Sequence, residues 1–275
     1  MEVMQELARD LRDEGQQLGE FILSLSDDAW QTQSPFKSWT IRDVLIHLMV
    51  GDRLNVLSMT AADQFQEIMA TRRARREAGQ PRTSGEEILE HEVAHDAEAV
   101  RQWLAGLNTL CDLFADADAR ARMKWVGPDM SIRSAATARL METWAHGQDI
   151  YDMMRAPRQH FDRVRHIAVL GVNTYNWTFS NRGLETPGPT PRVELKSPSG
   201  EWWCWNESET DNLVKGSAVE FCQVVTQGRN IGEVNLEVNG PNAQAWMAVA
   251  QCFAGTPEDP PAVGVRGWEK SRVEN

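Results

Sequence analysis

The chain has 275 residues, of which 41% are hydrophobic and 25% are charged, a composition that fits a globular protein and excludes an intrinsically disordered one. Its 40 acidic and 28 basic residues give a formal net charge of -12. A surface of that sign repels phosphate backbones and anionic lipid headgroups, so we expect neither nucleic acid nor a membrane as a partner.

The start of the chain and its cysteines indicate a compartment. The first residues, MEVMQELARD, are charged and lack the apolar stretch of a signal peptide. No uncharged apolar run approaches the roughly 18–20 residues that a membrane helix needs. The cysteines lie far apart in the sequence, as is typical of reduced thiols inside a cell: Cys111, Cys204, Cys222 and Cys252. We therefore expect a cytoplasmic protein.

The first part of the chain is predicted to be helical. Apolar residues recur at spacings of three, four and seven near the start, as in an amphipathic helix. Thr40, followed three residues later by Asp43, resembles a capping box that starts a second helix. Proline or glycine residues separate the predicted helices, which cover 2–25, 40–70, 84–110 and 131–155. Helices of this length favour a four-helix bundle over residues 1–157.

The sequence pattern changes after Pro157. Helical spacing continues in some segments, and short alternating runs between them predict strands. The helical segments are 161–180, 217–228 and 242–254, and the strands are 192–196, 201–205 and 234–238. We expect a small α+β domain over 158–255 and a flexible, proline-containing tail over 256–275. The expected fold class is therefore mainly α, a helical bundle followed by a small α+β domain.

Residues His91 to His95 read H-E-x-x-H, the sequence with which zincin proteases hold zinc on one helical turn. On a helix over 84–110, Val93 and Leu89 belong to the apolar stripe, whereas His91 and His95 fall on the opposite, solvent-facing side. A catalytic zinc also needs a third protein ligand and a shielded pocket. We therefore interpret these histidines as surface residues.

Glu142 and His146 lie one turn apart in the last predicted bundle helix. They share a narrow face of that helix with Ala135, Ala138 and Asp149. Burying such polar groups without partners would cost several kcal/mol. A bound metal ion or a closed hydrogen-bond network would remove that cost, and the small alanines leave room for something other than side chains. Both explanations stay open from the residues alone.

His47 can supply a third group from the second helix. It lies among apolar residues, where a lone histidine is usually a satisfied core residue. Because a bundle brings facing helices together, His47 can meet Glu142 and His146. Two histidines and a glutamate form a known catalytic zinc set with an open fourth position, and the set overlaps that of Fe(II) sites. Asp43 and Asp149 lie one turn from the two histidines, and would either orient the imidazoles or sit in helix-end salt bridges.

Two stretches carry a resemblance to a known family: Trp39–Leu48 (WTIRDVLIHL) and Glu142–Asp149 (ETWAHGQD). They resemble the DinB-like family of mycothiol-dependent maleylpyruvate isomerases. The run Ser131–Asp149 and the segment Asn181–Leu184 are similar to a largely uncharacterised branch of that family with its own C-terminal domain, and the resemblance extends to about residue 255. It implies an N-terminal DinB-like four-helix bundle that binds a divalent metal.

The resemblance also implies ligands and chemistry. Carried over position by position, the metal ligands are His47, Glu142 and His146. The metal would be zinc, with nickel or iron as alternatives. A metal-bound thiolate, from a low-molecular-weight thiol such as mycothiol, would be the nucleophile. The substrate would be a small anionic molecule, and the reaction would be an isomerisation or an S-transfer.

Two arginines are candidates for contacting the substrate anion. Arg229 matches the place of a C-domain arginine of the family, and Arg139 lies about 60° from the metal face on a helical wheel. For Arg229 the alternative is a surface arginine after a helix. Two further functions stay open: a hydrolase that uses metal-bound water, and a non-catalytic metal-binding module. The expected partners are the small-molecule substrate and the thiol, and the oligomeric state, monomer or homodimer, is left open.

Overall fold

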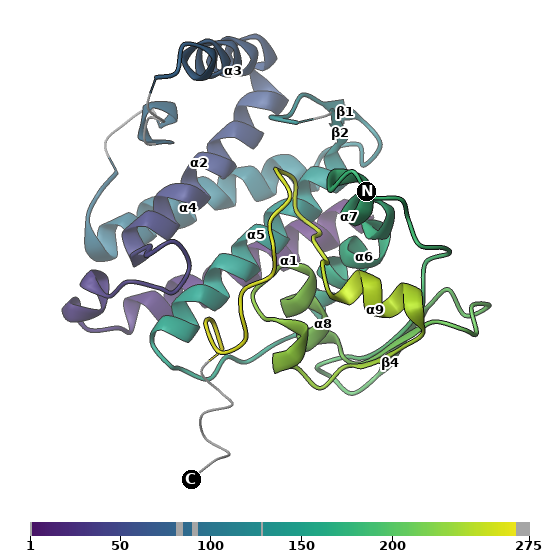
Figure 1. Cartoon of the computed structure of the whole chain (residues 1–275). Coiled ribbons are helices and arrows are strands. Elements are labelled where there is room, and N and C mark those ends of the chain that lie inside the picture. Colours follow the sequence, from purple (N-terminus) through teal and green to yellow (C-terminus); the bar gives the residue numbers. More distant parts are fainter. Residues whose placement is uncertain (1, 81–84, 90–92, 128, 268–275) are drawn as a thin grey trace. The chain divides into compact units, whose positions relative to one another are not determined.

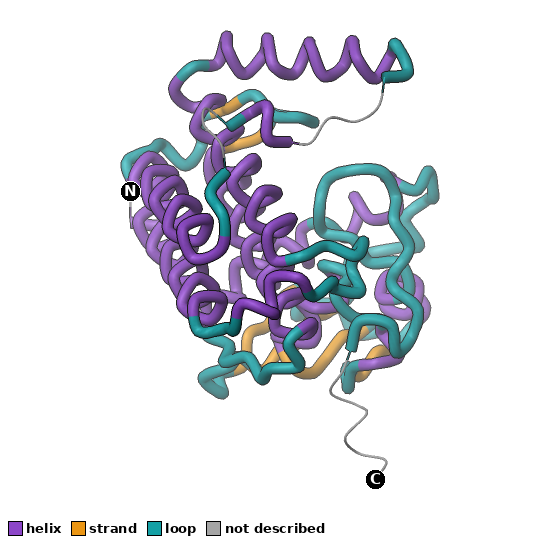
Figure 2. Tube along the Cα trace, turned by 90° about the vertical axis from the view of Figure 1, so that its left-hand side faces the viewer, coloured by secondary structure: helices purple, strands orange, loops and turns teal. Residues whose placement is uncertain are grey.

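The computed structural model describes residues 2–80, 85–89, 93–127 and 129–267 (Figure 1). The chain forms two compact units, residues 1–146 and 147–275. The division falls inside the helix α5 and not in the segment after residue 157, where the sequence pattern changes. Helices dominate the described chain and its strands are few and short, as Figure 2 shows, so the mainly α fold class is confirmed.

The long helices of the predicted bundle are present, and the last of them, α5, continues into the second unit. They are α1 (Glu2–Leu23), α2 (Ile41–Thr60), α4 (Asp96–Ala115) and α5 (Ile132–Met153). Both α1 and α2 pack against α4 (Figure 1). Leu11 and Leu18 of α1 are fully buried, and Gly15 between them lets α4 approach, because a Cβ at Gly15 would lie 2.1 Å from Cδ2 of Leu107. These helices form the expected bundle.

The second predicted helix, over 40–70, is divided in the structure. After α2, Ala61 leaves the helical region with φ −148° and ψ 61°, and a new helix, α3 (Ala62–Glu77), follows directly. The change of direction buries Phe65 in an apolar cluster with residues of α2. No proline or glycine marks this break, so the sequence pattern could not locate it.

The third predicted helix, over 84–110, is shorter than expected. Before α4, which begins at Asp96, the only helical residues that the structure describes in this range form the turn η2 (Gly85–Ile88). His95 precedes the helix and has an extended backbone, with φ −107° and ψ 155°. His95 is therefore not part of a helix, so the helical-wheel argument for the H-E-x-x-H sequence was wrong at this residue. His95 is nevertheless exposed, as expected. His91 and the residue after it lie outside the described residues.

Two of the connections in the first unit contain short elements of their own. A single turn, η1 (Asp27–Gln31), lies between α1 and α2. An antiparallel hairpin that the sequence did not predict precedes α5, in which β1 (Arg122–Met123) pairs with β2 (Met130–Ser131). Ser131 then caps α5 as expected, because its Oγ accepts a hydrogen bond of 3.1 Å from the backbone N–H of Ser134.

The second unit combines short helices with one sheet, which confirms the predicted α+β class. The sheet has the strand order β4–β3–β5–β6, with β3 and β5 parallel and the other pairs antiparallel. Its strands are β3 (Arg192–Lys196), β4 (Trp202–Trp205), β5 (Leu213–Ser217) and β6 (Glu237–Asn239). Its helices and turns are η3 (Asp162–Val164), α6 (Arg165–Asn173), α7 (Tyr175–Asn181), α8 (Ala218–Val225), η4 (Ile231–Glu233) and α9 (Pro241–Met247). The sequence missed β5, which contains only two apolar residues.

Aromatic rings form much of the core of the second unit. The ring of Trp246 packs edge to face against Tyr175 and Phe221, with centroid distances of 5.3 Å and 5.7 Å. Gly171 of α6 allows α8 to approach, because a Cβ there would lie 2.9 Å from the ring of Phe221. The close packing of α6 on α8 follows from that missing side chain.

The predicted flexible tail, 256–275, is anchored in its described part. The backbone N–H of Glu258 donates to Oε1 of Gln251 (3.0 Å), and that of Gly264 donates to Oε1 of Glu233 (2.9 Å). Residues 268–275 of the predicted tail lie outside the described residues. Among the described helices, none has the length and apolar character needed to cross a membrane.

Candidate metal centre

His47 is positioned by a helix with a well-defined start. Thr40 and Asp43 form the capping box that the sequence predicts: the Asp43 carboxylate accepts from the Thr40 backbone N–H at 2.9 Å, and the Thr40 hydroxyl accepts from the Asp43 N–H. Val44 and Leu48 on either side of His47 are buried, which fixes the face of α2 that carries the imidazole. The cap and this apolar face therefore determine where the imidazole lies.

Glu142 and His146 come from α5 and lie one turn apart on it, so their side chains share one face. Ala135 and Ala136 on the preceding turns are buried, and their small side chains project little from the helix. His146 Nε2 lies 3.3 Å from Glu142 Oε2, so the two side chains already point at one another.

The three side chains converge. His47 Nε2 lies 3.1 Å from the same Glu142 Oε2, and the two imidazole rings are 4.5 Å apart between centroids. One ligand atom from each residue lies within 4.8 Å of the others. Two ligands of a tetrahedral zinc ion, each bonded at roughly 2.0 Å, lie about 3.3 Å apart, so the spacing fits such an ion. The donor set, two nitrogens and a carboxylate oxygen, also suits zinc.

Aromatic rings cover one side of the imidazoles. The Phe36 ring lies 5.3 Å from the His146 ring, and the Trp39 ring lies 5.2 Å from that of His47. A tight turn holds both rings, in which the Ser34 N–H donates to the Trp39 carbonyl oxygen at 2.8 Å. Lys37, within this turn, has a left-handed backbone with φ 54°. Such a conformation is uncommon for a residue other than glycine, and here it occurs in the turn that holds the rings beside the imidazoles.

The site remains open to small molecules. The His47 side chain is 38% exposed and that of Glu142 is 28% exposed, whereas His146 is only 11% exposed. A ligand could therefore approach the group from the side of His47 and Glu142. Three protein ligands leave a coordination position for it.

The protonation states suit a metal ligand set. Burial lowers the pKa of His47, and this outweighs the opposing effect of its hydrogen bond to Glu142. For Glu142, burial would raise the pKa, but the hydrogen bonds and charges of His146 and His47 together hold that pKa well below its usual range. A neutral imidazole and an ionised carboxylate are the forms that bind metals.

The structure shows partners for Asp43 and Asp149, the two carboxylates predicted to orient the imidazoles. Asp43 directs its carboxylate to Thr40 in the capping box, where Thr40 Oγ1 also donates to it at 2.7 Å. Asp149 belongs to the second unit and forms an ion pair with Arg266 near the end of the described chain. Asp43 thus takes part in a helix-end interaction, whereas Asp149 pairs with an arginine outside its own helix. A role of either carboxylate in orienting the imidazoles stays a prediction.

The two predicted substrate-contacting arginines are buried and paired. Arg139 is 4% exposed and donates to the Asp52 carboxylate at 3.0 Å. Arg229 is also 4% exposed and donates to both oxygens of Asp152, at 2.6 Å and 2.7 Å. Both guanidinium groups therefore form internal ion pairs, and Arg229 also lines a pocket of the second unit. Contact of either arginine with a substrate anion stays a prediction.

Sequence reasoning missed the carboxylate partners of these arginines. Asp52 lies in an apolar stretch of α2 and is 3% exposed, while Asp152 near the end of α5 is 7% exposed. A charged residue within an apolar helix face signals a buried partner, because an unpaired charge there would be costly. That signal was available in the sequence, although the identity of the partner was not.

The chain is similar to a known protein family and to individual known proteins. Residues 11–151 match the family described as mycothiol maleylpyruvate isomerase N-terminal domain. An uncharacterised protein of Mycobacterium tuberculosis, found in two strains, is 38% identical over 249 residues, which cover 90% of this chain and 95% of that protein. A crystal structure of the mycothiol-dependent maleylpyruvate isomerase aligns with a TM-score of 0.47 and 11% identity, over 80% of this chain and 88% of that chain.

Proposed function

This chain belongs to the mycothiol maleylpyruvate isomerase N-terminal domain family, and from that premise we propose that it is a divalent-metal-dependent enzyme that uses a low-molecular-weight thiol. The thiol would be mycothiol or a close equivalent, and the substrate a small anionic molecule. The reaction would be an isomerisation or an S-transfer. Zinc is the proposed metal, with nickel or iron as alternatives.

The observation that carries this proposal is the convergence of two imidazole nitrogens on one carboxylate oxygen, at 3.1 Å and 3.3 Å. His47, Glu142 and His146 would hold the metal. A divalent cation at this place would lower the pKa of a bound thiol and favour its nucleophilic thiolate form.

The ligands and the side chains around them would also orient the imidazoles, cover one side of the site and leave a path for ligands. Glu142 supplies the negative charge of the ligand set, which keeps both imidazoles directed at one point. Phe36 and Trp39 cover one side of the imidazoles and keep water from that side. The exposed side of His47 and Glu142 leaves the path for thiol and substrate.

A protein thiol is not the proposed nucleophile. Burial raises the pKa of the Cys111 thiol to about 12 and that of Cys222 well above its usual range. Thiols of such high pKa are mostly protonated at neutral pH and react poorly. Neither of these buried thiols is therefore the proposed nucleophile, which would be a small thiol from outside the chain.

A thiol-dependence assay tests the function. Zinc-loaded protein would be incubated with maleylpyruvate, and with other small unsaturated carboxylates, in the presence and absence of mycothiol. The change from the cis to the trans alkene, or the loss of free thiol, would be followed by NMR. We expect turnover only with thiol and only with an intact ligand set, so a His47→Ala variant should be inactive.

The assay also separates the alternatives. Turnover of esters or amides without any thiol would replace this proposal with a metal-dependent hydrolase. Metal binding without turnover across a broad thiol and substrate panel would favour a non-catalytic metal-binding module.

A further inference from the structure

A buried polar network joins three helices of the first unit. Arg139 of α5 donates through Nε to Oδ1 of Asp52 on α2 at 3.0 Å, and through Nη2 to the Leu48 carbonyl oxygen at 3.2 Å. Trp103 of α4 donates through its indole N–H to the other Asp52 oxygen at 3.2 Å. Asp52 and Trp103 are 3% and 1% exposed. The network therefore lies inside the bundle, away from solvent.

This network lies next to the candidate metal ligands on both helices. Leu48, whose carbonyl oxygen Arg139 binds, directly follows His47 on α2. On α5, Arg139 precedes Glu142 by three residues, which is about one helical turn. The guanidinium thus links the turn of α5 before Glu142 to the turn of α2 that carries His47.

Close approach at this point depends on Gly51. A Cβ added there would lie 2.4 Å from Nη1 of Arg139 and 2.8 Å from its Cζ. The guanidinium therefore occupies the place that any other side chain on this turn of α2 would take. The guanidinium can lie this close to the α2 backbone only because residue 51 is a glycine.

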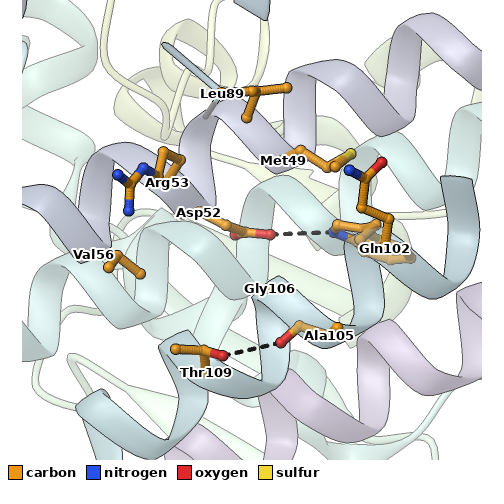
Figure 3. Close-up of a pocket in the computed structure, with 10 residues that line it drawn as sticks. Met49, Asp52, Arg53, Val56, Leu89, Gln102, Ala105, Gly106 and Thr109 are labelled. Atoms are coloured by element: carbon orange, nitrogen blue, oxygen red, sulfur yellow. Dashed lines mark hydrogen bonds between the residues drawn. The ribbon is translucent and has the colours of Figure 1, made fainter. Parts of the chain in front are cut away.

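Apolar packing beside this network is incomplete, because Asp52 and Trp103 also line a groove. This groove of about 360 Å³ lies between α2 and α4, with Met49 and Val56 on one wall and Ala105 and Gly106 on the other (Figure 3). A Cβ added at Gly106 would meet no atom within 4 Å. Part of the facing surfaces of α2 and α4 is therefore not filled by side chains, and the buried polar network adds a directional contact there that apolar packing does not supply.

A buried ion pair is seldom kept for stability alone. Removing two charges from water costs about as much as their attraction returns, and an apolar pair of similar volume is often as stable. The best-attested use of buried polar pairs is to fix one register of packed helices. The Asp52–Arg139 pair joins α2 to α5 in just this way.

We propose that Asp52 and Arg139 are positioning residues that set α2 against α5 so that His47 meets Glu142 and His146 at metal-binding distance. This inference rests on the proposed function, because it concerns the same ligand set. Gly51 takes part by leaving room for the guanidinium. The three residues do not touch the metal, and they act through the helices that carry its ligands.

Zinc affinity of the full-length protein, measured by competition with a chromogenic chelator, tests the proposal without any activity assay. The first variant is Gly51→Ala, which displaces the guanidinium without removing a charge and favours the helix. The second is the double variant Asp52→Asn, Arg139→Met, which leaves an oxygen to accept the Trp103 N–H. The control is Leu107→Ala, which removes a core contact between α4 and α1. Melting temperature is recorded for all.

We expect both variants to bind zinc about 10- to 100-fold more weakly than the wild type, as is usual when a residue that supports a metal ligand is lost. Leu107→Ala should melt at a lower temperature and keep wild-type zinc affinity. Unchanged affinity in both variants would overturn the positioning role and leave the proposed function intact, and so would an equal loss of affinity in the control. A wild type that binds neither zinc nor nickel nor iron would overturn the proposed function and this inference together.

Discussion

The imidazole rings of His47 and His146 lie 4.5 Å apart and are inclined at 71° to one another, although they belong to different helices of the bundle. Each ring presents Nε2 to the same oxygen of Glu142. An arrangement with two nitrogens around one carboxylate oxygen suits a shared cation better than it suits an apolar core. The predictions below follow from that arrangement and from the ion pairs around it.

Zinc should stabilise the folded protein through this site. A ligand that binds only the folded state, at a free concentration 100-fold above its dissociation constant, adds about 2.7 kcal/mol to the free energy of unfolding. Chelator-treated protein should therefore melt at a lower temperature than zinc-loaded protein by differential scanning fluorimetry. The difference should vanish in a His146→Ala variant. A zinc-dependent shift that persists in this variant would place the metal elsewhere.

Asp43 should matter for stability and not for metal binding. Its carboxylate completes the capping box with Thr40, so an Asp43→Ala variant should lower the free energy of unfolding by about 0.5–1 kcal/mol in urea titrations. A Thr40→Ala variant breaks the same box from the other side and should have a similar effect. Loss of bound metal in Asp43→Ala but not in Thr40→Ala would show instead that the carboxylate orients His47.

Arg229 should behave as a structural residue. Its two-point pair with Asp152 is buried, so an Arg229→Met variant leaves an unpaired carboxylate and should lose about 3–5 kcal/mol of stability. Removing the carboxylate as well, in a double variant with Asp152→Leu, should recover most of that loss. The alternative is a substrate contact, which would appear as a stable Arg229→Met variant with a raised KM.

The cysteines should differ in reactivity because of pKa and burial. With its pKa raised to about 12 by burial, Cys111 is ionised to about one part in ten thousand at pH 8. Cys204 is exposed, so iodoacetamide at pH 8 should label Cys204 in the folded protein and spare Cys111 and Cys222. Labelling of Cys111 should rise as the pH approaches 12, because the thiolate share rises with pH.

Mass spectrometry of labelled peptides measures this directly. A Cys204→Ser variant should lose the rapid labelling, and protein unfolded in guanidinium should be labelled at every cysteine. Rapid modification of Cys111 in folded protein at pH 8 would contradict the burial of its thiol, and would reopen the choice of an external thiol as nucleophile.

The sequence could predict the parts of this fold that repeat with a clear period. The apolar stripe located α1, and Thr40 with Asp43 located the start of α2. Ser131 and Pro157 bounded the segment that contains α5. Alternation located β3, β4 and β6, which lie within or beside the predicted strands. The sequence also singled out His47, Glu142 and His146, because polar groups on an apolar helix face need a partner.

Other features depend on contacts that no local pattern contains. The break at Ala61 arises where Phe65 turns into an apolar cluster, and alanine itself favours a continued helix. The late start of α4 follows from the hydrogen bond of the Ala94 N–H to Gln102 Oε1, a contact across eight residues. The partners of Arg139 and Arg229 are 87 and 77 residues away in the chain, so their burial could not be read from the flanking residues.

The metal content of the purified protein tests the central claim most directly. Wild type and Glu142→Gln would be reconstituted with zinc, dialysed and measured by inductively coupled plasma mass spectrometry, with circular dichroism to show that both are folded. We predict about one equivalent of zinc per chain in the wild type and a loss of most of it in the variant. A wild type without metal, or a folded variant that retains the full equivalent, would contradict the account.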